Sequence, residues 1–135
     1  SMVQKLDHLD YIPPCESYTD FHQIETEEWL ELIRLIRARS SYDSVILDLG
    51  MAMGHETELL RQCDGIYVPV RQDMISRAKL AQWENAVQIL GGLDIVEKFQ
   101  KLEIPENSEI PESRDDLLML PQQSFGMYIR GLLKG

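Results

Sequence analysis

The most regular pattern of apolar and polar positions follows Thr26. Trp29, Leu32, Ile33 and Ile36 recur at intervals of three and four residues, which places them on one face of an α-helix. The threonine hydroxyl can cap the first turn, and glutamates near the start and arginines near the end suit the helix dipole. The pattern therefore predicts an amphipathic helix with one apolar face.

Two β-rich runs lie on either side of a short helical segment. Residues 44–49 form an almost continuous apolar run that ends with Asp48 and Leu49. Such a run is typical of a strand that is buried on both faces inside a parallel sheet. Residues 56–63 predict a short helix that stops at Asp64-Gly65, and residues 65–70 predict the second strand.

The rest of the chain continues this alternation of strands and helices. Asp73 can cap a longer helix that Gly91-Gly92 end, a helical turn is predicted over 94–99, and a strand over 100–104. Together these elements predict one α/β domain over residues 2–135, with a mainly parallel sheet and flanking helices. A last helix is predicted from the spacing of five apolar residues: Phe125, Tyr128, Ile129, Leu132 and Leu133.

The chain is acidic, with 13 basic and 23 acidic residues among 135. A net charge of −10 argues against a protein that grips nucleic acid through its phosphates. The acids are dense between residues 94 and 116, and within that stretch residues 105–116 predict an acidic loop. No apolar run is long enough to cross a bilayer, and two cysteines, Cys15 and Cys63, favour ordinary cytosolic thiols. We therefore expect a cytoplasmic protein.

Asp48 is the strongest candidate for a functional residue. A carboxylate at the carboxyl end of a core strand lies where parallel sheets place their ligands. Desolvation of such a carboxylate is costly unless a metal, a base or backbone amides meet it. Gly50 and Gly54 follow directly and suit a loop that passes close to a ligand. A helix cap at Asp48 and a simple glycine turn remain the structural alternative.

The order of motifs after residue 41 resembles the second half of the MinD/ParA group of P-loop ATPases, and most closely its CpaE-like members associated with pilus assembly. The motifs are Tyr42-Asp43-Ser-Val-Ile-Leu-Asp48, a helix, and Cys63-Asp64-Gly-Ile-Tyr-Val-Pro-Val70. Leu9-Asp-Tyr-Ile-Pro-Pro14 resembles the strand and loop that come earlier in that family, and the segment from Phe125 resembles its terminal helix. The resemblance implies a bacterial protein with a partial P-loop NTPase fold, a Rossmann-like arrangement of three layers.

The resemblance assigns Asp48 as the Walker B carboxylate, which holds Mg²⁺ through water, and places Gly50 and Gly54 in the switch region. The chain departs from the family in one large respect, because it contains no Gly-x-x-x-x-Gly-Lys-Ser/Thr loop to hold the phosphates of ATP. We therefore expect the C-terminal portion of such an ATPase, which binds ATP and Mg²⁺ in the intact parent and is not catalytic alone. Loss of the phosphate-loop strand would leave a sheet edge unpaired, so self-association through that edge, or another protein partner, is expected.

Two alternatives remain open. Val45-Ile-Leu-Asp48-Leu-Gly-Met51 also resembles the phosphoacceptor strand of a response-regulator receiver domain. That chemistry needs further acids and a lysine, and the chain offers at most Asp10 among the acids and no Lys-Pro. The other alternative is a non-catalytic interaction module, in which the acidic stretch 94–116 contacts basic partners.

Overall fold

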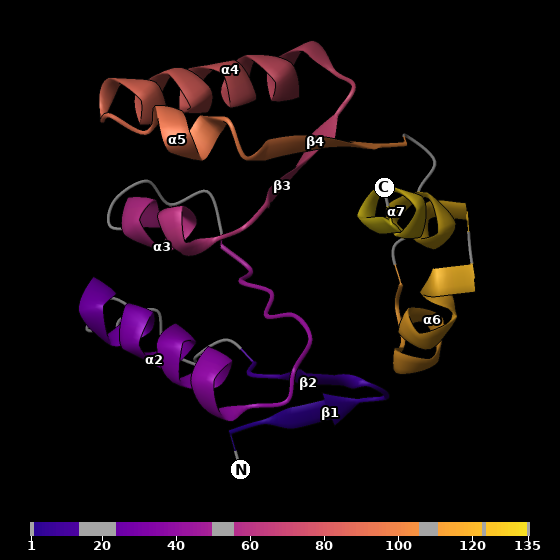
Figure 1. Cartoon of the computed structure of the whole chain (residues 1–135). Coiled ribbons are helices and arrows are strands. Elements are labelled where there is room, and N and C mark those ends of the chain that lie inside the picture. The colour runs from indigo at the N-terminus through magenta and orange to yellow at the C-terminus, as the bar shows by residue number, and fades with distance from the viewer. Residues whose placement is uncertain (1, 14–23, 50–55, 106–110, 123, 135) are drawn as a thin grey trace. The chain divides into compact units, whose positions relative to one another are not determined.

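The computed structural model describes residues 2–13, 24–49, 56–105, 111–122 and 124–134 (Figure 1). The chain divides into two compact units, Ser1–Asp64 and Gly65–Gly135. Its described elements form a mixed α/β structure with two two-stranded sheets, one antiparallel and one parallel. The α/β class is confirmed, and among the described residues the parallel part of the structure is a single pair of strands. One domain over 2–135 stays a prediction.

The first unit begins with a β-hairpin. Strand β1 (Gln4–Leu6) pairs antiparallel with β2 (Leu9–Tyr11), and the two residues between them make the turn. Asp7 in this turn has a φ of 54°, a left-handed conformation that aspartate tolerates better than most residues. The segment that resembles a strand of the ATPase family is therefore the second strand of a local hairpin.

Helix α2 (Thr26–Arg39) confirms the predicted amphipathic helix, and its apolar face buries Ile33. The predicted cap is one residue out of place. Glu25 occupies the cap position, and its backbone N–H donates to the Glu28 carboxylate at 2.9 Å. The glutamate three residues into the helix satisfies this amide, so Thr26 can enter the first turn. Helix α3 (Glu56–Gln62) contacts α2 and confirms the second predicted helix.

The strand predicted over residues 44–49 does not form, so this prediction is wrong for the described chain. These residues belong to no helix or strand. Val45 and Ile46 are exposed, Ile46 by 83%, although the apolar run predicts burial. A strand is stable only when a neighbour accepts and donates its backbone hydrogen bonds, and no described strand pairs with this segment. The apolar sequence is present, but no described segment pairs with it.

The second unit is built on a strand–helix–strand crossover. Strand β3 (Ile66–Arg71) leads through α4 (Met74–Ile89) and α5 (Leu93–Val96) to β4 (Phe99–Ile104), which pairs parallel with β3. Both predicted strands and the long helix are confirmed. Val70 from β3, Leu80 from α4 and the fully buried Ile95 from α5 contribute to the core of this unit.

Local chemistry sets the ends of α4. The Asp73 side chain accepts a hydrogen bond from the Ser76 backbone N–H at 2.8 Å, which confirms the predicted cap. Gly91, with a φ of 82°, provides the left-handed turn that stops the helix. The half-buried ring of Trp83 on α4 stacks on the ring of Phe99 at the start of β4.

Three helical elements complete the second unit: α6 (Arg114–Met119), the 3₁₀ turn η1 (Leu120–Gln122) and α7 (Ser124–Lys134). Helix α7 confirms the predicted last helix. Helix α6 corrects the loop predicted over 105–116, because Ser113 and Asp116 form a reciprocal capping box that starts a helix within it. Residues 106–110 of that stretch lie outside the described residues.

Candidate functional site

Asp48 is exposed and makes no hydrogen bond or ion pair with the described residues. The segment that carries it forms no strand, so the carboxylate is not held at the edge of a sheet. Gly50 and Gly54, the other two predicted site residues, lie outside the described residues. Within the part of the chain that the structure describes, no group of three or more His, Cys, Asp or Glu side chains could hold a metal ion. A single exposed carboxylate fits a water-mediated role beside phosphates, because Mg²⁺ keeps most of its waters.

Asp10, the acid that a receiver domain would use beside Asp48, has other partners. The Tyr42 hydroxyl donates to Asp10 Oδ2 at 2.5 Å, and Lys5 Nζ lies 3.9 Å from Oδ1. The hydrogen bond to the carboxylate is the main cause that raises the pKa of Tyr42. This contact joins the hairpin to the segment just before residues 44–49 and gives Asp10 a structural role in the first unit.

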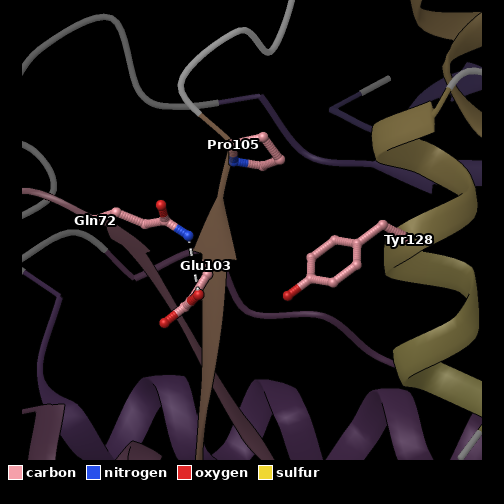
Figure 2. Close-up of a pocket in the computed structure, with 4 residues that line it drawn as sticks. All are labelled: Gln72, Glu103, Pro105 and Tyr128. Carbon is pink, nitrogen blue, oxygen red and sulfur yellow. Dashed lines mark hydrogen bonds between the residues drawn. The ribbon is translucent and has the colours of Figure 1, made fainter.

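A different set of side chains meets at the carboxyl ends of the parallel pair. Gln72 follows β3 directly, and its side-chain amide donates to the Glu103 carboxylate of β4 at 3.1 Å. These two residues, with Pro105 and Tyr128 of α7, line an open pocket of about 440 Å³ (Figure 2). Figure 2 shows the hydroxyl end of Tyr128 pointing from α7 toward Glu103. In α/β proteins ligands bind at this end of parallel strands, so the pocket is a candidate site of the second unit.

The electrostatics of this edge favour positive groups. The described lining residues include one carboxylate and no basic side chain. Arg71 ends β3 and is exposed, but it does not line the pocket. The Asp73 carboxylate caps the N-terminus of α4. The Ser76 hydroxyl and backbone N–H both donate to this carboxylate and lower its pKa. An anion would therefore meet a carboxylate at both strand ends.

The acidic stretch 94–116 is partly used inside the second unit. Glu103 accepts from Gln72, as described above. Asp116 accepts from the Ser113 backbone N–H at 3.0 Å, and hydrogen bonds from the Ser113 side chain and nearby amides lower its pKa. The interaction module therefore remains a prediction, with at least two of its acids already engaged in hydrogen bonds of the fold.

Sequence reasoning missed the residues of the pocket. The end of β3 was predicted, but the partner of Gln72 depends on the register that sets Val70 opposite Glu103. Tyr128 was predicted as one of several apolar positions on the last helix, and its spacing gives no sign of a pocket. The rule that ligands gather at the carboxyl ends of parallel strands was the available signal, and it pointed to residues 71–73 as well as to Asp48.

No described helix is long and apolar enough to cross a membrane. No protein-family model, curated protein or solved structure matches the chain.

Proposed function

We propose that the chain is the C-terminal portion of a MinD/ParA/CpaE-like ATPase domain of a bacterial cytoplasmic protein, in which Asp48 is the Walker B acid. The parent would act in partitioning, positioning or pilus assembly. The observation that carries the proposal is the order of the sequence motif, the helix and the strands along the chain. The Tyr42–Asp48 motif precedes a helix, and the strand from Ile66 then begins a parallel crossover to β4.

The unformed strand supports this proposal. In the family the phosphate-loop strand lies within the central sheet, and the present sequence contains no phosphate loop. A sheet that lacks an interior strand leaves the strands on both sides of the gap without a partner. Residues 44–49 have a strand-like apolar sequence with Ile46 exposed, and β3 pairs on one edge only among the described residues. An interior strand supplied by the parent would give both a partner.

In the parent, Asp48 would hold Mg²⁺ through water, and Gly50 and Gly54 would belong to the switch region beside ATP. The metal supplies charge neutralisation at the phosphates when it is bound. This chain contributes the acid that orients the metal's waters. It has no lysine-bearing glycine loop, so hydrolysis by the chain alone is not expected.

The second edge of β3, with which no described strand pairs, is also the proposed route of self-association. Ile66 donates its backbone N–H to Lys98 O at 3.1 Å, so the alternate residues Tyr67 and Pro69 turn their backbone groups toward the open edge. Proline has no N–H, so a strand added there would pair mainly beside Tyr67. A sedimentation measurement tests this idea: a concentration-dependent dimer supports it, and a monomer at all concentrations contradicts it.

The first test of the proposed function is to read the genomic DNA sequence upstream of the codon for residue 2. An open reading frame with a Gly-x-x-x-x-Gly-Lys-Ser/Thr loop is expected, and its absence would overturn the proposal. The second test compares phosphate release by the full polypeptide with that of its Asp48→Asn and Glu27→Gln variants. Glu27 is an exposed acid of α2, outside the Tyr42–Asp48 motif, and serves as the control. We expect Asp48→Asn to lower turnover at least tenfold and Glu27→Gln to change it less than twofold.

A further inference from the structure

The pocket at the carboxyl ends of β3 and β4 has a composition that differs from a nucleotide site. It combines the Glu103 carboxylate, the Gln72 amide, the Pro105 ring and the phenol of Tyr128 (Figure 2). Nucleotide phosphates are bound by clustered backbone N–H groups and by lysine or arginine, and none of the described residues that line this pocket is a lysine or arginine. The side chains present instead offer acceptor oxygens and flat apolar surfaces.

Glu103 is held in place but not neutralised. Gln72 Nε2 donates to its Oε2, which orients the carboxylate without a positive charge. Its other oxygen, Oε1, has no partner among the described residues. From residue 103 to residue 116 the sequence contains six acids and one base, Arg114, so the stretch of chain that begins with Glu103 carries a net negative charge. A positive group that enters the pocket would meet a carboxylate oxygen that is ready to accept.

We propose that this pocket binds the guanidinium group of an arginine side chain presented by a protein partner. A guanidinium is planar, always charged and weakly hydrated, so it can donate to a carboxylate while its face lies against an aromatic ring. Glu103 supplies the carboxylate, and the Tyr128 ring and Pro105 supply flat apolar surfaces. An ammonium group carries the same charge but lacks the plane, so lysine is expected to bind more weakly. The proposal rests on the second unit alone and is independent of Asp48 and ATP.

The test is an NMR titration of the whole chain with N-acetyl-arginine amide. We expect saturable shifts of the backbone amide signals of Gln72, Glu103, Ile104 and Tyr128, with N-acetyl-lysine amide binding at least threefold more weakly. Glu103→Gln keeps the size of the side chain and is expected to weaken arginine binding at least fivefold. Tyr128→Leu is expected to weaken it as well. Glu97→Gln removes an exposed acid after α5 and is expected to have no effect.

Three results would overturn the proposal. They are the absence of saturable shifts at these residues, equal affinity of Glu103→Gln and the unchanged chain for the arginine probe, and equal binding of the lysine probe. A titration with ATP covers the competing ligand class: shifts of the same four residues by ATP, without shifts by arginine, would show that the pocket takes a nucleotide instead. Dispersed spectra of both pocket variants are the control that they remain folded.

Discussion

The ring of Trp83 in α4 stacks on the ring of Phe99 at the first position of β4, with centroids 4.7 Å apart and planes inclined by 4°. This contact joins the middle of the helix to the second strand of the crossover, so it packs α4 against β4. On the same side, Lys101 Nζ lies 3.4 Å from the Glu84 carboxylate. The aromatic pair is half-buried and should contribute more than this ion pair, because water screens the exposed Lys101 ammonium group.

Trp83→Ala is expected to lower the free energy of unfolding of the second unit by about 2–3 kcal/mol, less than for a fully buried tryptophan. A double-mutant cycle with Phe99→Leu should give a coupling of about 1 kcal/mol. Urea unfolding followed by circular dichroism measures both values. Gln82→Ala, an exposed neighbour on α4, is the control and should change the stability by less than about 0.5 kcal/mol. A coupling near zero would show that the stack does not stabilise the crossover.

Alanine substitutions at two glycines of α7, one at the contact with η1 and one away from it, test how α7 packs against η1. A Cβ on Gly126 would collide with the backbone carbonyl of Leu120, whereas a Cβ on Gly131 would meet open space. Gly126→Ala should therefore destabilise the docking of α7 by about 1–3 kcal/mol. Gly131→Ala should stabilise the helix by about 0.5–1 kcal/mol. Amide hydrogen exchange in α7 reads out both effects, and equal protection in the two variants would contradict the packing described here.

A comparison of alanine variants of Ile46 and Ile66 tests whether residues 44–49 contribute to the stability of this chain. Ile66 is 8% exposed in β3, and its truncation to alanine should cost about 2–4 kcal/mol. Ile46→Ala should change the free energy of unfolding by less than about 0.5 kcal/mol, because the side chain is already in water. Thermal unfolding of the two variants makes the comparison. In the full polypeptide of the proposed ATPase, Ile46→Ala should become strongly destabilising, since the strand would be buried there.

The cap of α4 predicts a pH dependence. Hydrogen bonds from Ser76 lower the pKa of Asp73 in the folded state, so folding favours the charged carboxylate. The stabilising effect of the charged Asp73 carboxylate is fully present above the ordinary pKa of aspartate, about 4. This effect is lost as the pH falls through the lower pKa that Asp73 has in the folded state. Asp73→Ala should therefore be less stable than the unchanged chain at pH 7, and the difference should shrink below about pH 4.

Unfolding curves at pH 7, 5 and 3 measure this difference. Asp94→Asn, in the first turn of α5, is the control. A gap between Asp73→Ala and the unchanged chain that does not vary with pH would show that Asp73 acts through packing rather than through its charge.

Local sequence patterns identified most of the elements of the second unit. Asp73 was recognised as a cap because its side chain acts on amides three residues away, within the same turn. Strand β3 and the last helix were recognised from residue type and spacing. Helix α6 was missed because the acidic, turn-rich sequence around it predicts a loop, while a single capping box between Ser113 and Asp116 is enough to start a short helix.

The sequence by itself therefore determined the longer helices, the cap of α4 and the two strands of the parallel pair, since these depend on residue types and spacing within a few residues. Tertiary structure alone decided two things: that residues 44–49 stay unpaired, and that Gln72, Glu103 and Tyr128 meet. The physical reason is the same in both cases. A strand needs the hydrogen bonds of a distant segment, and a pocket needs a register between distant segments, and neither is encoded in the spacing of nearby residues.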